Sequence, residues 1–143
     1  MSISDIEIKR KMRRLCGKTA VVYLAAAVLC LVITNVYARF GHGIRSDSMD
    51  FMFLYPLLGG TLVFLTAAGL SCLLPVRLSV ITRIGCNLYH SGIASLTSAA
   101  MLTGIMEIAG TGSPWISYLF SAGILLLAAG LSCLTNMFRP CKQ

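Results

Sequence analysis

The sequence predicts an all-α membrane protein, a bundle of four transmembrane helices preceded by a short basic segment. Hydrophobic residues make up 57% and charged residues 12% of the 143 positions, a balance that does not suit a surface in contact with water. Four windows without Lys, Arg, Asp or Glu each provide the roughly 20 apolar residues that a spanning helix needs. The letters AAGLSCL also occur twice, at residues 67–73 and 128–134, each time closing a long apolar run.

The repeated heptapeptide predicts how the helices are arranged. Each copy is followed within a few residues by a basic residue, Arg77 or Arg139, as expected where two helices leave the membrane on the same side. Two helical hairpins of the same orientation would place both termini on that side and give an internal repeat. The alternative is that small residues near a helix exit were selected twice for packing. The expected spans are residues 19–38, 51–74, 84–106 and 115–137.

The basic residues predict the orientation in the membrane. Ten of the twelve lie on the side of the two termini, and the exceptions are Arg39 and Arg45. Such a bias marks the cytoplasmic side, so both termini are expected on that side. The membrane is expected to be the plasma membrane. The same clustering beside one span argues against a nucleic-acid partner.

Residues 1–18 are expected to form a separate cytoplasmic amphipathic segment, followed by one transmembrane domain over residues 19–143. Ser4 and Glu7 have the spacing of a capping box, and Ile8, Met12 and Leu15 form an apolar stripe among the cations. The bilayer itself is therefore a predicted partner, with anionic lipids bound at this segment. The alternative is a basic flank that only sets the topology.

The second span is predicted to be kinked or broken. Pro56 removes a backbone donor, and the pair Gly59 and Gly60 allows a neighbouring helix to come close. Backbone groups freed in this way are tolerated only against protein or a water-filled cavity. Transporters place substrates at such helices, although a packing kink is the alternative. Gly69 and Gly130, one in each heptapeptide, are further predicted close-packing positions.

The third span carries a wide face of polar and small residues. Its polar members cannot point at lipid without losing hydrogen bonds, so this face should line the bundle centre or an oligomer interface. His90 is the ionisable side chain well inside a span, and it is a functional candidate or a neutral imidazole bonded to Asn87, Tyr89 or a backbone carbonyl. The predicted pore-lining or substrate-lining residues are Asn87, His90, Ser91, Ala94, Ser95, Thr97, Ser98 and Met101.

The outer loops contain the remaining ionisable candidates, His42, Asp47, Asp50 and Glu107. Three potential ligands in the first loop are weak support for a cation or proton site, so no metal site is predicted. The alternative is a solvated turn in which Arg45 pairs with Asp47.

No catalytic residue and no cofactor is predicted. The sequence has no Walker loop, dinucleotide fingerprint, HExxH, nucleophile elbow or CxxC pair. It also lacks the central acidic residue of small cation exporters. The six cysteines are expected to be structural thiols, with Cys30 inside the first span and the others near the cytoplasmic face.

These features predict a small polytopic protein that forms a homo-oligomer and moves a small solute or ion along the polar face of the third helix. The alternative is a non-catalytic accessory or scaffold subunit that packs against a larger membrane partner through the same face. An intramembrane enzyme that uses His90 and a cytoplasmic cysteine has the least support.

Overall fold

The fold is all-helical, with turns and short loops between the helices, in the part of the chain that the computed structural model describes, residues 3–40, 45–73 and 80–135. Four stretches there are long and apolar enough to cross a membrane: Arg10–Phe40, Asp47–Gly69, Thr82–Ile108 and Trp115–Thr135. They are consistent with the predicted integral membrane protein. The elements are α1 (Ile3–Phe40), α2 (Asp47–Asp50), the π-helix η1 (Tyr55–Leu62), α3 (Val63–Leu73), α4 (Val80–Ile108) and α5 (Trp115–Thr135).

Helix α1 is one continuous element of 38 residues. It runs without interruption through residue 18, where the amphipathic segment is expected to meet the first span. The helix contains no proline, and its single glycine, Gly17, does not interrupt it. At 1.5 Å per residue it is about 57 Å long, nearly twice the roughly 30 Å of a bilayer's hydrocarbon core. One end of α1 must therefore extend beyond the membrane interior.

The second span is irregular where Pro56 and the glycine pair predict a kink. A turn at residues 51–53 separates α2 from η1, and η1 continues into α3. The Tyr89 hydroxyl of α4 donates a 2.6 Å hydrogen bond to the Gly59 carbonyl, which links α4 to this irregular stretch. On the other side, a Cβ atom at Gly60 would overlap the Tyr23 ring of α1. The π-helix is thus enclosed between α1 and α4.

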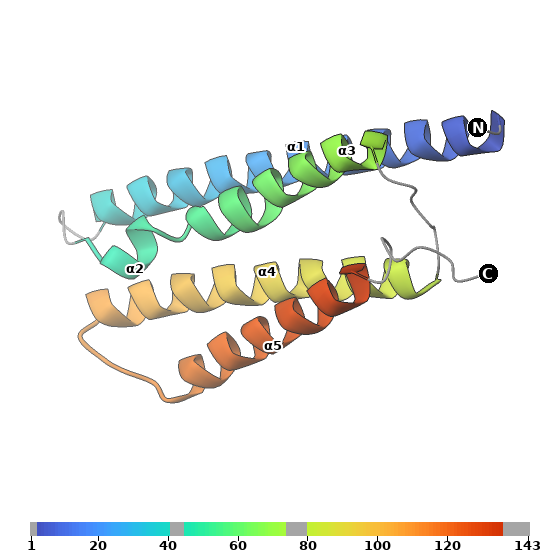
Figure 1. The fold of residues 1–143 in the computed structure, drawn as a ribbon. Helices are drawn as coiled ribbons and strands as arrows, with labels where there is room; N and C mark the ends of the chain where they lie inside the picture. The colour runs from blue at the N-terminus through green and yellow to red at the C-terminus, as the bar shows by residue number, and fades with distance from the viewer. Residues whose placement is uncertain (1–2, 41–44, 74–79, 136–143) are drawn as a thin grey trace.

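The helices lie side by side in two pairs, as Figure 1 shows. Helix α1 packs along η1 and α3, while α4 packs along α5, and the pairs meet where α4 contacts α2 and η1. Helices α1 and α4 run in one direction, and α3 and α5 run in the opposite direction (Figure 1).

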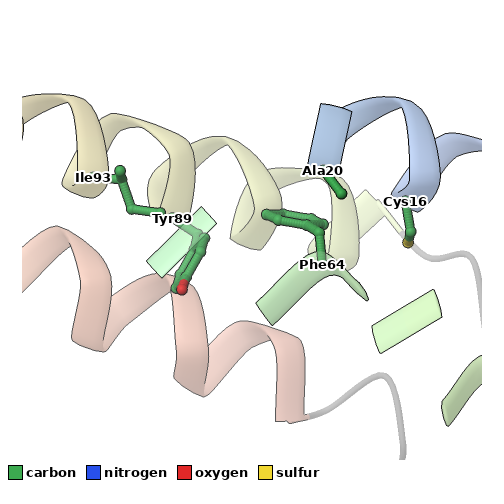
Figure 2. Packing of buried hydrophobic residues seen from close by; sticks show 5 residues of the cluster. All are labelled: Cys16, Ala20, Phe64, Tyr89 and Ile93. Carbon is green, nitrogen blue, oxygen red and sulfur yellow. The ribbon is translucent and has the colours of Figure 1, made fainter. Parts of the chain in front are cut away.

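Two small hydrophobic clusters hold the pairs together. In Figure 2 the Phe64 ring lies between Ala20 of α1 and Tyr89 of α4, and Cys16 and Ile93 complete this inner cluster. An outer cluster joins Cys30, Met52 and Ala100. Much of the apolar surface remains outside both clusters, as a surface in contact with lipid should. Examples are Val21, with 66% of its surface exposed, and Leu125, with 69%.

Glycines allow α4 and α5 to approach closely. A Cβ atom at Gly130 of α5 would lie 2.7 Å from the Tyr89 nitrogen, and one at Gly92 of α4 would lie 2.8 Å from the Leu127 nitrogen. Gly85 and Gly123 face equally close neighbours on the opposite helix. Small residues at helix contacts of membrane proteins have this effect, because backbones can then touch.

The two copies of AAGLSCL have different surroundings. Gly130, in the second copy, is buried against α4, whereas a Cβ atom at Gly69 in the first copy would have no atom within 4 Å. Close packing at these two predicted positions therefore occurs at Gly130 and is not seen at Gly69. Identical letters form the ends of two helices without making the same contacts.

This difference supplies a matched pair of substitutions. Gly130→Ala should destabilise the protein by about 1–3 kcal/mol, because the added methyl overlaps the α4 backbone. Gly69→Ala should be neutral or stabilising by about 0.5–1 kcal/mol, because the methyl enters open space and alanine favours helix. Unfolding of each purified variant in mixed detergent and SDS micelles measures the change. Equal effects at the two positions would contradict the packing described here.

Candidate functional site

A groove of about 610 Å³ between α1 and α4 is the candidate site. It is bounded on one side by α1 and on the other by the face of α4 that the sequence marks as polar. The proline of the π-helix closes its base. The lining residues are Lys18, Thr19, Val22, Tyr23, Ala26 and Cys30 of α1, Pro56 of η1, and His90, Ile93, Ala94, Thr97 and Ser98 of α4.

His90 is held in this groove by side chains of two other helices. Its Nδ1 lies 2.6 Å from the Tyr23 hydroxyl of α1 in a hydrogen bond. Its ring stacks on Phe64 of α3, with 5.1 Å between ring centroids, and Phe64 in turn stacks on Tyr23 at 5.8 Å. The imidazole is thus fixed in orientation by one hydrogen bond and one stacked ring.

The eight residues predicted to line a path lie in different surroundings. Four of them, His90, Ala94, Thr97 and Ser98, line the groove. Ser95 instead points toward α5, where its hydroxyl donates to the Leu119 carbonyl at 3.4 Å. Met101 packs on the outer hydrophobic cluster.

The other two predicted residues, Asn87 and Ser91, are exposed beside the groove. Ala94 and Ser98 are exposed as well, so an exposed stripe made of Asn87, Ser91, Ala94 and Ser98 follows one edge of α4. Neither Asn87 nor Ser91 has a side-chain hydrogen bond within the described residues. The sequence predicts that this face is shielded, and within one chain the shielding is incomplete. Helix α5 packs against the glycine-rich side of α4 and therefore leaves the polar stripe uncovered.

A separate polar cluster joins α2 to the C-terminal end of α4. The Glu107 carboxylate accepts hydrogen bonds from the hydroxyls of Ser46 and Ser48, the latter at 2.9 Å. The buried Thr34 hydroxyl of α1 donates to the Met49 carbonyl at 3.0 Å. Glu107 thus holds the segment at Ser46 and Ser48 against the C-terminal end of α4.

The ion pair in the segment between α1 and η1 differs from the expected one. Arg45 pairs with Asp50 at 3.8 Å rather than with Asp47. His42 lies outside the described residues. Among those that are described, no group of three His, Cys, Asp or Glu side chains could hold a metal ion.

A second groove, of about 540 Å³, lies on the other side of the contact between α4 and the π-helix. Its lining is mainly apolar and includes Leu54, Leu58 and Phe120. Ile93 lines both grooves and is 3% exposed, so its side chain forms the wall between them.

Sequence reasoning missed Tyr23, whose hydroxyl is the partner of His90. The first span looks like aliphatic packing surface, and the proposed partners of His90 were Asn87, Tyr89 and backbone carbonyls. One signal was present, because a tyrosine hydroxyl inside an apolar helix needs a hydrogen-bond partner. Phe64 gave no such signal, since a phenylalanine in an apolar run fits any buried or lipid-facing position.

Comparison with protein families, with characterised proteins and with solved structures gives no match for this chain. A function must therefore be argued from the geometry and chemistry of its own residues. Fold class alone would not supply one, because helical bundles serve many functions.

Tyr23→Phe tests the hydrogen bond to His90. The substitution keeps the ring stacked on Phe64 and removes the hydroxyl, so we expect a loss of about 0.6 kcal/mol, the average for such bonds between membrane helices, and at most about 1.7 kcal/mol. Tyr37→Phe on the same helix is the control and should have little effect. Unfolding in SDS micelles, combined with His90→Ala in a double-mutant cycle, measures the coupling. A coupling energy of zero would show that the bond contributes nothing.

Proposed function

We propose that this chain is a homo-oligomeric membrane protein that moves a small solute or ion along the polar face of α4. The observation that supports the proposal is the exposed stripe. Its Asn87 and Ser91 have no partner among the described residues, and unpaired polar groups are costly in hydrocarbon. If stripes of neighbouring copies face one another, the polar groups line a shared path and leave the lipid.

The chemistry around the stripe favours a neutral or anionic solute. Within the described part of the chain, neither the stripe nor the lining of the groove beside it includes a carboxylate. The stripe offers the amide of Asn87 and two serine hydroxyls, which donate and accept hydrogen bonds. His90, at the groove edge, adds a side chain that can bind or carry a proton.

We further propose the topology that the charges favour, two similarly oriented hairpins with both termini on the cytoplasmic side of the plasma membrane. The exposed cations at the start of α1 support it, and anionic lipids are their expected partners. These residues are Arg10, Lys11, Arg13, Arg14 and Lys18. The start of α1 and the end of α5 lie toward the same end of the molecule in Figure 1. Arg77, Arg139 and Lys142 lie outside the described residues.

The second candidate is an accessory subunit that packs against a larger membrane protein. It rests on the same observation, since any protein covering Asn87 and Ser91 would satisfy their polar groups. An intramembrane enzyme has less support. His90 is hydrogen-bonded to Tyr23, and no thiol lies within hydrogen-bond distance of it among the described residues.

The substitutions Asn87→Ala and His90→Ala separate transport from the accessory role. In the transport case the oligomer persists while the flux into proteoliposomes falls at least severalfold, because the polar path loses its hydrogen-bonding groups. Light scattering after osmotic shock with glycerol, urea or potassium chloride measures the flux. Ser121→Ala on the exposed side of α5 is the control and should leave the flux unchanged.

The outcomes of this experiment are distinct. Wild-type protein that forms oligomers but passes none of these probes would contradict transport. Loss of a co-purifying membrane protein in Asn87→Ala would instead support the accessory role. Unchanged flux and assembly in both variants would reject a function for this face.

Cysteine labelling tests whether water reaches the stripe. In a variant without native cysteines, Ser91→Cys and Ser98→Cys should react with a membrane-impermeant maleimide. Ser95→Cys should react far more slowly, because Ser95 points toward α5 and bonds the Leu119 carbonyl. Equal protection at all three positions would argue against a water-lined path.

A further inference from the structure

The groove between α1 and α4 changes in polarity along its length. Among the described residues that line it, Lys18 is the one that carries a charge, and it stands at the end nearest the start of α1. Farther along α1 the lining is Val22, Ala26 and Cys30. A ligand that fits this groove therefore has a negative charge at one end and an apolar remainder.

The groove wall offers few free hydrogen-bonding groups to a polar ligand. The Tyr23 hydroxyl is bonded to His90. The Thr97 hydroxyl donates to the Ile93 carbonyl at 2.8 Å, and the Thr19 hydroxyl donates to the Leu15 carbonyl at 3.0 Å. Because these three hydroxyls already have partners inside the protein, a hydrocarbon chain can lie against them without leaving them unpaired. The Ser98 hydroxyl and the His90 Nε2 also belong to the lining and have no partner among the described residues, so the acyl chain is expected along the α1 side of the groove.

The length of the groove corresponds to one leaflet of a bilayer. From Lys18 to Cys30 the helix rises about 18 Å at 1.5 Å per residue. Half of a hydrocarbon core of about 30 Å is about 15 Å. A lipid with its phosphate beside Lys18 would thus extend one acyl chain to the end of the groove near Cys30.

Charge on α1 favours an anionic headgroup at this end. Lys11 and Arg14 precede Lys18 at steps of three and four residues, so the three cations share one face of the helix. All three are exposed. Each cation near a membrane surface favours anionic lipid, and a lysine can extend its ammonium group from the helix to the phosphate level.

We propose that this groove binds one anionic phospholipid, with its phosphate on Lys18 and one acyl chain along Val22, Ala26 and Cys30. This inference goes beyond the proposed function, because it concerns binding and holds whether or not the chain transports a solute. It also differs from general attraction of the basic residues to a charged membrane, because it requires one lipid at one place.

Titration of the delipidated full-length protein, followed by native mass spectrometry, tests the proposal. The probes are phosphatidylglycerol and phosphatidylcholine with identical acyl chains. We expect one phosphatidylglycerol per chain to bind more tightly than phosphatidylcholine. Lys18→Gln should weaken phosphatidylglycerol binding about fivefold, the effect of one surface cation. Lys11→Gln, which does not line the groove, should stay within about twofold of wild type by the same reasoning, since its charge lies farther from the bound phosphate.

A second pair of variants tests the acyl-chain position independently of charge. Ala26→Leu fills the groove and should abolish binding of a first phosphatidylglycerol, whereas Ala25→Leu, on the exposed side of the same turn, should leave it intact. The proposal is overturned if phosphatidylcholine binds as tightly as phosphatidylglycerol, if Lys18→Gln matches Lys11→Gln, or if Ala26→Leu binds like Ala25→Leu. Tighter binding of oleate than of phosphatidylglycerol would likewise overturn it in favour of a free fatty acid.

Discussion

The contact between α4 and α5 determines which side of α4 remains for function. Glycines on both helices, such as Gly92 and Gly130, bring the backbones within the distance at which a single methyl group would clash. Without a hydrophobic driving force between helices in lipid, such close packing supplies much of the attraction. Because α5 covers this side, the polar side of α4 faces α1 and the surface of the chain.

The irregular second span also determines how the helices pack. A π-helix keeps backbone hydrogen bonds of its own, between residues five apart, and in lipid a further hydrogen bond has to come from protein. Tyr89 supplies it by donating to the Gly59 carbonyl, and its ring also packs in the inner cluster. The neighbouring residue His90 points to the groove and bonds Tyr23. Two adjacent residues of α4 therefore connect this helix to both of its partners in the first pair.

The sequence was sufficient for properties that depend on local composition. Apolar length predicts four candidate spans, and Pro56 with its glycine pair predicts an irregularity where the π-helix occurs. The sequence does not show that the basic segment and the first span form one continuous helix, because a change from basic to apolar residues alters the surroundings of a helix without ending it. The Tyr23 and His90 bond was missed as well. It joins residues 67 positions apart, and no periodicity within one helix contains that information.

The repeated heptapeptide also shows that local sequence does not determine tertiary contacts. Its letters dictate a helix with small residues near its end, and both copies are helical. The contacts of each glycine depend on which helix packs beside it. Gly130 packs against Tyr89, whereas a Cβ atom at Gly69 would have no atom within 4 Å. Equal local sequence is therefore compatible with unequal packing. A pseudo-symmetric arrangement would require equivalent neighbours in addition to equivalent letters.

The polar residues of the candidate site fall into two groups that require different surroundings. Tyr23 and Thr97 have their hydroxyls bonded within the protein, so the surface they form can face hydrocarbon at little cost. Asn87 and Ser91 are exposed and unbonded within the described residues, so they require water or another protein. Thr97 lies on a strip of α4 next to the strip that carries Asn87 and Ser91, and Tyr23 of α1 lies across the groove from Thr97. A lipid in the groove and a polar neighbour on the stripe can therefore be accommodated together, because each covers the strip that the other cannot stabilise.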